Sequence, residues 1–218
     1  MLALLSLLLP VATLLRGPYA TKSEVVRVPA LDLSSHWVDI YYATNATQPL
    51  RFISFAHGAG GGLFIQPFVY TSLLHALAAW GYVVAAPRAC LFGDCHGLKG
   101  DYYKHQLEMI DWARKEGAKG HAVLSLVNFT GGVGITGHSM GGAATLVSSE
   151  EANAQAYDVV AAVMLHAYTH EAGPPAIPFL AFTGTTDTTA SMSMTEHFCG
   201  PREIRIPHKC GRQVVRSR

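Results

Sequence analysis

The stretch Val133-Gly-Ile-Thr-Gly-His-Ser-Met-Gly-Gly142 decides how the rest of this chain is interpreted. Its central pentapeptide fits the pattern G-x-S-x-G. The apolar run before it, Gly132 to Thr136, predicts a buried strand, and the small residues from Ala143 onward favour a helix. A serine on so tight a turn must adopt strained backbone angles, and residues two positions before and after it would clash if they carried a Cβ. Both are glycine, so the pattern predicts that Ser139 stands at a sharp strand-to-helix turn.

Length and composition set the class of protein. The chain has 218 residues, half of them apolar, with a formal net charge of +1. Such a chain can bury one sizeable core, so we expect residues 21–218 to form a single domain. The near-neutral charge gives no indication of a nucleic-acid partner.

The first fifteen residues are almost wholly apolar. This run is too short to cross a bilayer, which takes about 20 residues. We interpret residues 1–20 as a secretory signal peptide, with cleavage after Ala20, and an uncleaved signal anchor is the alternative. The predicted location is therefore secreted or in the lumen of the secretory pathway, or else tethered to a membrane by the anchor.

Two further features agree with a secretory route. The triplets Asn45-Ala-Thr47 and Asn128-Phe-Thr130 fit the N-glycosylation pattern. The four cysteines fall into two sequence-local pairs, so of three possible connectivities we favour Cys90–Cys95 with Cys199–Cys210. Free buried thiols are the alternative.

The apolar pattern predicts alternating strands and helices. Residues 23–28 and 36–42 alternate apolar and polar positions, as an antiparallel edge pair does. The other expected strands cover residues 51–56, 82–87, 132–136, 157–166 and 178–183, and the expected helices cover 68–80, 101–116, 191–198 and the segment after Ser139. Strands that are apolar on both faces and alternate with helices predict an α/β fold with a mostly parallel sheet flanked by helices.

Polar or glycine residues follow nearly all of the buried strands. The strand ends read His57-Gly58, Pro87, Gly137 to Ser139, His166 and Gly184 to Asp187. Function gathers at the carboxyl ends of the strands in such sheets. This placement supports a site at Ser139 independently of the pentapeptide.

Acyl transfer at a serine makes two chemical demands. The hydroxyl is a weak nucleophile and needs a base. The oxyanion formed on attack needs hydrogen-bond donors, which the amide of Met140 and a second amide near Gly60 and Gly61 are placed to supply.

The combination of Gly137-His-Ser-Met-Gly-Gly142, His57-Gly58 and Thr183-Gly-Thr-Thr-Asp187 resembles the α/β-hydrolase superfamily. Within it, the chain looks closest to cutinase-like polyester hydrolases, dienelactone-hydrolase-like enzymes and chlorophyllases. The resemblance covers roughly residues 35–198. It implies that Ser139 is the nucleophile, that Asp187 is the triad acid, and that Met140, Gly60 and Gly61 form the oxyanion hole.

The acid and the base each leave an alternative. Glu171 competes with Asp187 as the acid. The base follows the acid in the usual order, which leaves His197 and His208. His197 falls within an expected helix, whereas His208 follows a minimal strand at residues 203–206 and is favoured. The chain end is nevertheless short or atypical for the fold, and residues 199–218 are interpreted as an alternative or shifted end that could lack the true base.

The length of the connection between two of the expected strands bears on the substrate. About twelve residues separate His166 from Pro178, which leaves no room for a cap domain, so we expect an open, lidless site. Leu63, Phe64 and Tyr168 are candidates for its apolar wall, with ordinary core residues as the alternative. We therefore expect a hydrolase of small-molecule, lipid or polymeric carboxylic esters.

No cofactor or metal is expected. His166 and His170 are interpreted as lining the site or lying on the surface rather than as a metal pair. The alternatives are a lipase or acylglycerophosphocholine-esterase-like enzyme, and a binding protein on the same fold that lacks a proper triad histidine.

Overall fold

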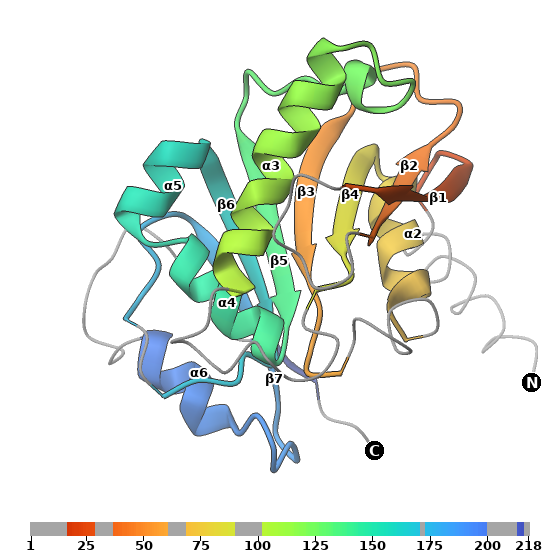
Figure 1. Ribbon diagram of the computed structural model, residues 1–218. Helices are drawn as coiled ribbons and strands as arrows, with labels where there is room; N and C mark the ends of the chain where they lie inside the picture. The colour runs from red at the N-terminus through yellow and green to blue at the C-terminus, as the bar shows by residue number, and fades with distance from the viewer. Residues whose placement is uncertain are drawn as a thin grey trace, which may run out of the picture.

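The described residues form one mixed sheet between two layers of helices. The structure is a computed structural model that describes residues 17–28, 37–60, 69–89, 102–170, 173–199 and, for the backbone, 213–215. Within these ranges the sheet has eight strands in the order β1-β2-β4-β3-β5-β6-β7-β8 (Figure 1). The strands are β1 Thr21–Arg27, β2 Trp37–Ala43, β3 Arg51–Ala56, β4 Tyr82–Pro87, β5 Val133–His138, β6 Val159–Leu165, β7 Phe179–Gly184 and β8 Gln213–Val215.

The expected α/β class is confirmed. Strand β1 pairs antiparallel with β2, and β2 pairs antiparallel with β4. All other pairings are parallel. The predicted edge pair and the strands predicted at residues 51–56 and 82–87 are thus observed. The minimal strand expected at residues 203–206 lies outside the described residues, and the last described strand is β8 instead.

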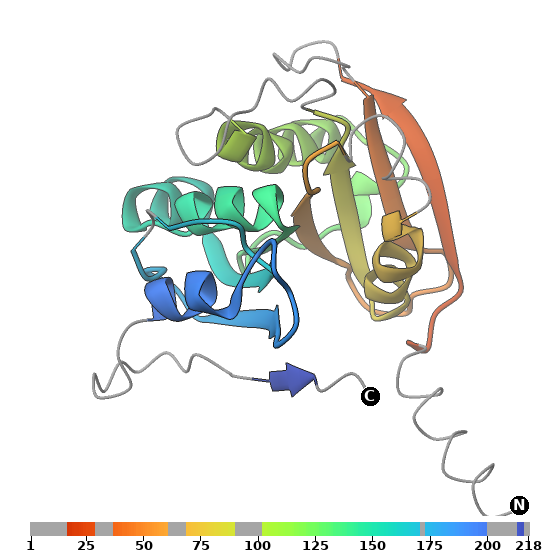
Figure 2. The ribbon, with the colours of Figure 1, turned by 90° about the horizontal axis from the view of Figure 1, so that it is seen from below.

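Helices cover both faces of the sheet, but unequally. Helices α3, α4 and α5 lie on one face and α2 lies on the other, as the view from below makes clear (Figure 2). The helices are α2 Thr71–Ala79, α3 Tyr102–Ala118, α4 Met140–Ser148, α5 Glu151–Tyr157 and α6 Met192–Cys199, with a short 3-10 turn η2 at Leu124–Leu126. No helix in the described part of the chain combines the length and apolarity that crossing a bilayer requires.

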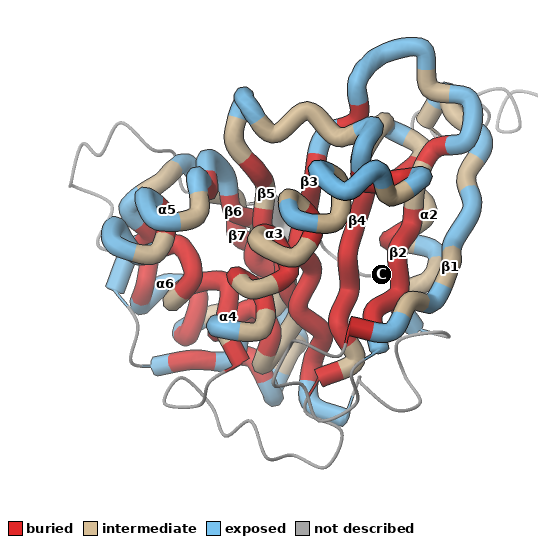
Figure 3. Tube along the Cα trace, turned by 45° about the horizontal axis from the view of Figure 1, so that its top comes forward, coloured by how far each residue is buried: buried red, intermediate tan, exposed pale blue. Residues whose placement is uncertain are grey.

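The core explains why the central strands are apolar at successive positions. In β3, Phe52 packs into the core on the side of α3 and α4, whereas Ile53 and Phe55 pack into a second cluster on the side of α2. The tube view shows β3, β4 and β5 buried along most of their length (Figure 3). Burying a side chain such as Phe55 contributes about 1.5–3 kcal/mol to the free energy of unfolding. The buried side chains of these strands therefore stabilise the centre of the sheet.

A buried amide joins the elements around Ser139. The side-chain nitrogen of Gln106 on α3 donates to the carbonyl of Thr136 on β5 and to the hydroxyl of Thr145 on α4, both at 3.0 Å. The hydroxyl of Ser54 on β3 donates to the backbone carbonyl of Gln106 at 2.6 Å. Because these groups are fully buried or nearly so, losing one partner would leave an unsatisfied polar group. This network fixes α3 against the strand and the helix that flank Ser139.

Candidate active site

Ser139 occupies the turn between β5 and α4, in the strained conformation that the sequence predicts. Its φ is +53°, in the left-handed region that costs a residue with a side chain roughly 1–3 kcal/mol. Its amide donates to the Leu165 carbonyl at 2.9 Å, and its carbonyl accepts from Ala143 at 3.1 Å in the first turn of α4. These bonds hold the serine between two fixed elements.

Two glycines make the turn possible. A Cβ on Gly137 would overlap the carbonyl of Gly141, and a Cβ on Gly141 would overlap the carbonyl of Ala56 at the end of β3. Because these obstacles are backbone atoms, they cannot move aside easily. The predicted reason for glycine on both sides of Ser139 is confirmed.

The loop after β3 lies directly against Ser139. A Cβ on Gly58 would stand 3.3 Å from the Cβ of Ser139 and 2.8 Å from the Nδ1 atom of His138. Gly60 adopts a φ of +71° further along the same loop. Met140, the other predicted oxyanion donor, is the first residue of α4, where the free amides and the helix dipole favour negative charge. The loop after β3 and the first turn of α4 therefore both lie next to Ser139.

His57 fixes the start of this loop. Its ring nitrogens lie 2.7 Å from the carbonyls of Gly58 and Ala89, and its own amide donates to the hydroxyl of Tyr102 at 2.7 Å. Complete burial lowers the pKa of His57. The ring contacts with the carbonyls of Gly58 and Ala89 raise this pKa by a smaller amount, and the contact with Ala89 ties the end of β3 to the segment after β4.

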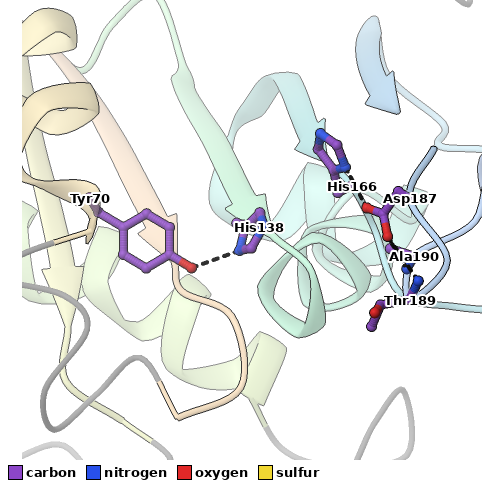
Figure 4. Close-up of polar contacts among 6 residues, drawn as sticks. All are labelled: Tyr70, His138, His166, Asp187, Thr189 and Ala190. Atoms are coloured by element: carbon purple, nitrogen blue, oxygen red, sulfur yellow. Dashed lines mark hydrogen bonds and ion pairs between the residues drawn. The ribbon is translucent and has the colours of Figure 1, made fainter. Parts of the chain in front are cut away.

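A tyrosine that sequence reasoning missed bridges the loop and the serine turn. The Tyr70 hydroxyl accepts from the Gly58 amide at 3.0 Å and lies 2.7 Å from the Nδ1 atom of His138 (Figure 4). This contact joins the loop after β3 to the residue that precedes Ser139. Burial, followed by the neighbouring His166, lowers the pKa of His138, and the charge of Asp187 partly opposes this. No local pattern around Tyr70 distinguishes it from a core tyrosine.

Asp187 lies in the loop after β7 and accepts three hydrogen bonds. One carboxylate oxygen is 2.7 Å from the Nδ1 atom of His166, and the other accepts from the amides of Thr189 and Ala190, both at 2.9 Å (Figure 4). The bond to His166 is the main cause that lowers the pKa of Asp187, and the two amides add to it against a smaller effect of burial. Asp187 is therefore ionised near neutral pH.

The partner of Asp187 is His166, which the sequence analysis interpreted as a residue that lines the site or lies on the surface. His166 follows β6 with a φ of +50°. Its ring lies beside Gly184, where a Cβ would stand 3.2 Å from its Cε1 atom. The signal that could have found it is the pairing of β6 with β7, because the ends of neighbouring parallel strands place His166 and Asp187 side by side.

His166 and Ser139 lie on neighbouring backbone segments. The Ser139 amide donates to Leu165, and the Tyr168 amide donates to the Ser139 carbonyl at 3.0 Å, so the two bonds bracket His166. Within the described ranges the Ser139 hydroxyl makes no hydrogen bond. The structure thus brings Ser139, His166 and Asp187 to the ends of three consecutive strands without joining the serine oxygen to a base.

Some of the remaining predicted residues are described, and others lie outside the described ranges. Tyr168 is described, and about half of its surface is exposed. His197 lies on α6. Cys199 forms a disulfide, whereas the other three cysteines lie outside the described residues. The predicted site residues outside the described ranges are Gly61, Leu63, Phe64, His208 and the alternative acid Glu171, and the predicted signal is described only at residues 17–20.

An apolar cavity of about 560 Å³ lies on the face of the sheet that carries α2. Helix α2 packs on β2 and β4, and the cavity extends beyond it over β5, β6 and β7. Its lining includes Ile53, Leu77, Thr136, Val163, Leu165 and Phe182. Leu165 precedes His166 in the chain and pairs in register with His138, so the cavity ends next to the two histidines.

Comparisons with known proteins add no assignment. Neither the protein-family models nor the curated proteins include a match to this chain.

In the described ranges, no group of three or more His, Cys, Asp or Glu side chains is placed to hold a metal ion. The chemistry of the site is therefore argued from its own residues.

Proposed function

We propose that the protein is a secreted serine hydrolase of the α/β-hydrolase type that cleaves carboxylic esters. The observation that carries this proposal is Ser139 at a φ of +53° between β5 and α4, flanked by two glycines that admit no side chain. Strained residues cluster at functional sites. A serine presented in this way at the carboxyl edge of a parallel sheet is the arrangement of a nucleophile elbow.

The reaction follows from the groups around Ser139. Its Oγ atom attacks the ester carbonyl as a histidine takes the hydroxyl proton, and the histidine passes that proton to the leaving alkoxide. Water then cleaves the acyl-enzyme by the same route. The amide of Met140 and an amide of the loop around Gly60 stabilise the oxyanion, and ionised Asp187 orients the histidine and stabilises its cation.

The connections support an open site. The chain runs from the end of β6 at Leu165 to the start of β7 at Phe179 in a short loop, which has no room for a cap domain. An open site accepts exposed or bulky esters, including polymeric ones. No metal or cofactor takes part in the proposed reaction.

One observation favours a second candidate, a lipase-like enzyme for esters of long-chain acids. The apolar cavity of about 560 Å³ ends at Leu165, next to His166, and an apolar wall suits an acyl chain. A series of p-nitrophenyl esters from two to sixteen carbons separates the candidates. A general esterase peaks at short chains, whereas the lipase-like enzyme peaks at eight carbons or more.

The proposed function is tested by steady-state hydrolysis of the best ester in this series. Ser139→Ala should reduce kcat by roughly 10⁴-fold or more, because the acyl-enzyme no longer forms. The matched control is Ser125→Ala, which removes an exposed hydroxyl at the opposite end of the sheet and should keep full activity. Equal activity of Ser139→Ala and the wild type would refute the proposal.

A further inference from the structure

We propose that His166 is the general base of this site, and that Asp187 orients it for Ser139. This inference rests on the proposed function, because a base has a role only if Ser139 is a nucleophile. It differs from the sequence-based prediction of His208, which follows from the usual order of triad residues rather than from a contact.

The contact with Asp187 selects the reactive form of His166. An ionised carboxylate can only accept hydrogen bonds, so the Nδ1 atom of His166, at 2.7 Å, must be the donor. The proton of a neutral ring is then on Nδ1, and Nε2 carries the lone pair. Within the described ranges Nε2 has no hydrogen-bond partner, which leaves it free to accept a proton.

The backbone places His166 next to Ser139. The bonds from Ser139 to Leu165 and from Tyr168 to Ser139 continue the pairing of β5 with β6 past the end of both strands. Neighbouring strands are about 4.8 Å apart, so His166, which follows the second of these three strands, stands between Ser139 and Asp187 along the carboxyl edge of the sheet. The His166 side chain is 36% exposed, so its ring is not enclosed by neighbours.

Backbone strain marks the same two residues. Only Ser139, Asp158 and His166 have a positive φ among the non-glycine residues in the described ranges. Asp158 ends helix α5 in a common helix-terminating conformation. Ser139 and His166 lie side by side at the carboxyl edge of the sheet. Strained backbone conformations of this kind cluster at functional sites.

Ser139, His166 and the departing alkoxide account for every proton in the acylation step. As Oγ of Ser139 bonds to the acyl carbon, its O–H bond breaks and the proton moves to Nε2 of His166. The imidazolium remains bonded to Asp187 through Nδ1, which stabilises the new positive charge. The same proton then moves to the departing alkoxide oxygen, and the carbonyl double bond reforms as the C–O bond breaks.

The experiment compares His166→Ala, His166→Gln and His170→Ala with the wild type in ester hydrolysis. We expect kcat to fall by roughly 10²–10⁴-fold in both His166 variants. Glutamine can still donate to Asp187 but cannot carry the proton, so it separates loss of the base from loss of the contact. His170→Ala removes an exposed histidine four residues further along and should retain full activity.

A second readout distinguishes a base from a structural residue. Added imidazole should restore part of the activity of His166→Ala, because the free base can occupy the space of the lost ring. Full ester hydrolysis by His166→Gln would overturn the proposal. Full hydrolysis by His166→Ala, together with loss of hydrolysis in His208→Ala, would also overturn it. In both cases the proposed esterase function would stand. A wild-type protein without turnover that depends on Ser139 would overturn the proposed function as well.

Discussion

The Nδ1 atom of His166 lies 2.7 Å from a carboxylate oxygen of Asp187, which joins the loops that follow β6 and β7. Ser139 follows β5, the next strand in the sheet. Three consecutive strands therefore present a hydroxyl, an imidazole and a carboxylate at one edge. This relationship has consequences for stability as well as for the proposed chemistry.

The pH dependence of stability should report the Asp187 contacts. Because the pKa of Asp187 is lowered in the folded state, its contribution is present above the ordinary aspartate pKa of about 3.9. It is lost as the pH falls through the lower folded value. We expect the wild type to have a higher Tm than Asp187→Asn near pH 7 and the difference to shrink below about pH 4. A difference in Tm that is constant from pH 7 to pH 2 would contradict this account.

Two alanine substitutions in β5 should have opposite outcomes. A Cβ on Gly137 overlaps the carbonyl of Gly141, whereas a Cβ on Gly134 has its nearest neighbour, the Ile53 side chain, at 3.4 Å. Gly137→Ala should destabilise the protein by about 1–3 kcal/mol or more, and Gly134→Ala should change stability little. Urea unfolding measures both, and equal stabilities would show that the turn is looser than described.

Removing the Tyr70 hydroxyl should weaken the loop after β3. Tyr70→Phe leaves the Gly58 amide and Nδ1 of His138 without their shared partner, at a cost of about 1–3 kcal/mol. The control is Tyr82→Phe, whose hydroxyl makes no hydrogen bond in the described part of the chain. Urea unfolding that shows the same stability for the two variants would rule out the bridge.

Reduction should destabilise the protein through Cys199. This residue ends α6 and is disulfide-bonded, so a reducing agent should lower the free energy of unfolding by about 2–4 kcal/mol. Peptide mapping of the unreduced protein identifies the partner. The predicted linkage is to Cys210, and a linkage to Cys90 or Cys95 would contradict the predicted pairing.

The fold was predictable where burial leaves a clear pattern. Strands β3 and β4 are packed on both faces, so they are apolar throughout and their limits match the sequence-based prediction. Helix α5 was not separated from the segment after Ser139, because its seven residues include only one buried side chain, Ala154. Short helices of this kind depend on tertiary contacts rather than on a periodic pattern.

The site was predictable only in part. Ser139 follows from a local motif whose glycines have a local steric cause. The roles of Tyr70 and His166 depend on which segments the sheet brings together, and neither residue carries a motif of its own. In the usual order of triad residues the histidine follows the acid. This order favours His208, which follows Asp187 in the chain, over His166, which precedes Asp187.

The most direct test of the central claim is labelling of the full chain with a fluorophosphonate probe, followed by peptide mapping. The probe reacts with a serine only when its oxygen is activated. The account predicts a single adduct on Ser139, absent in Ser139→Ala and much slower to form in His166→Ala. A folded wild-type protein that shows no adduct and no ester turnover would contradict it and would indicate a binding protein on this fold.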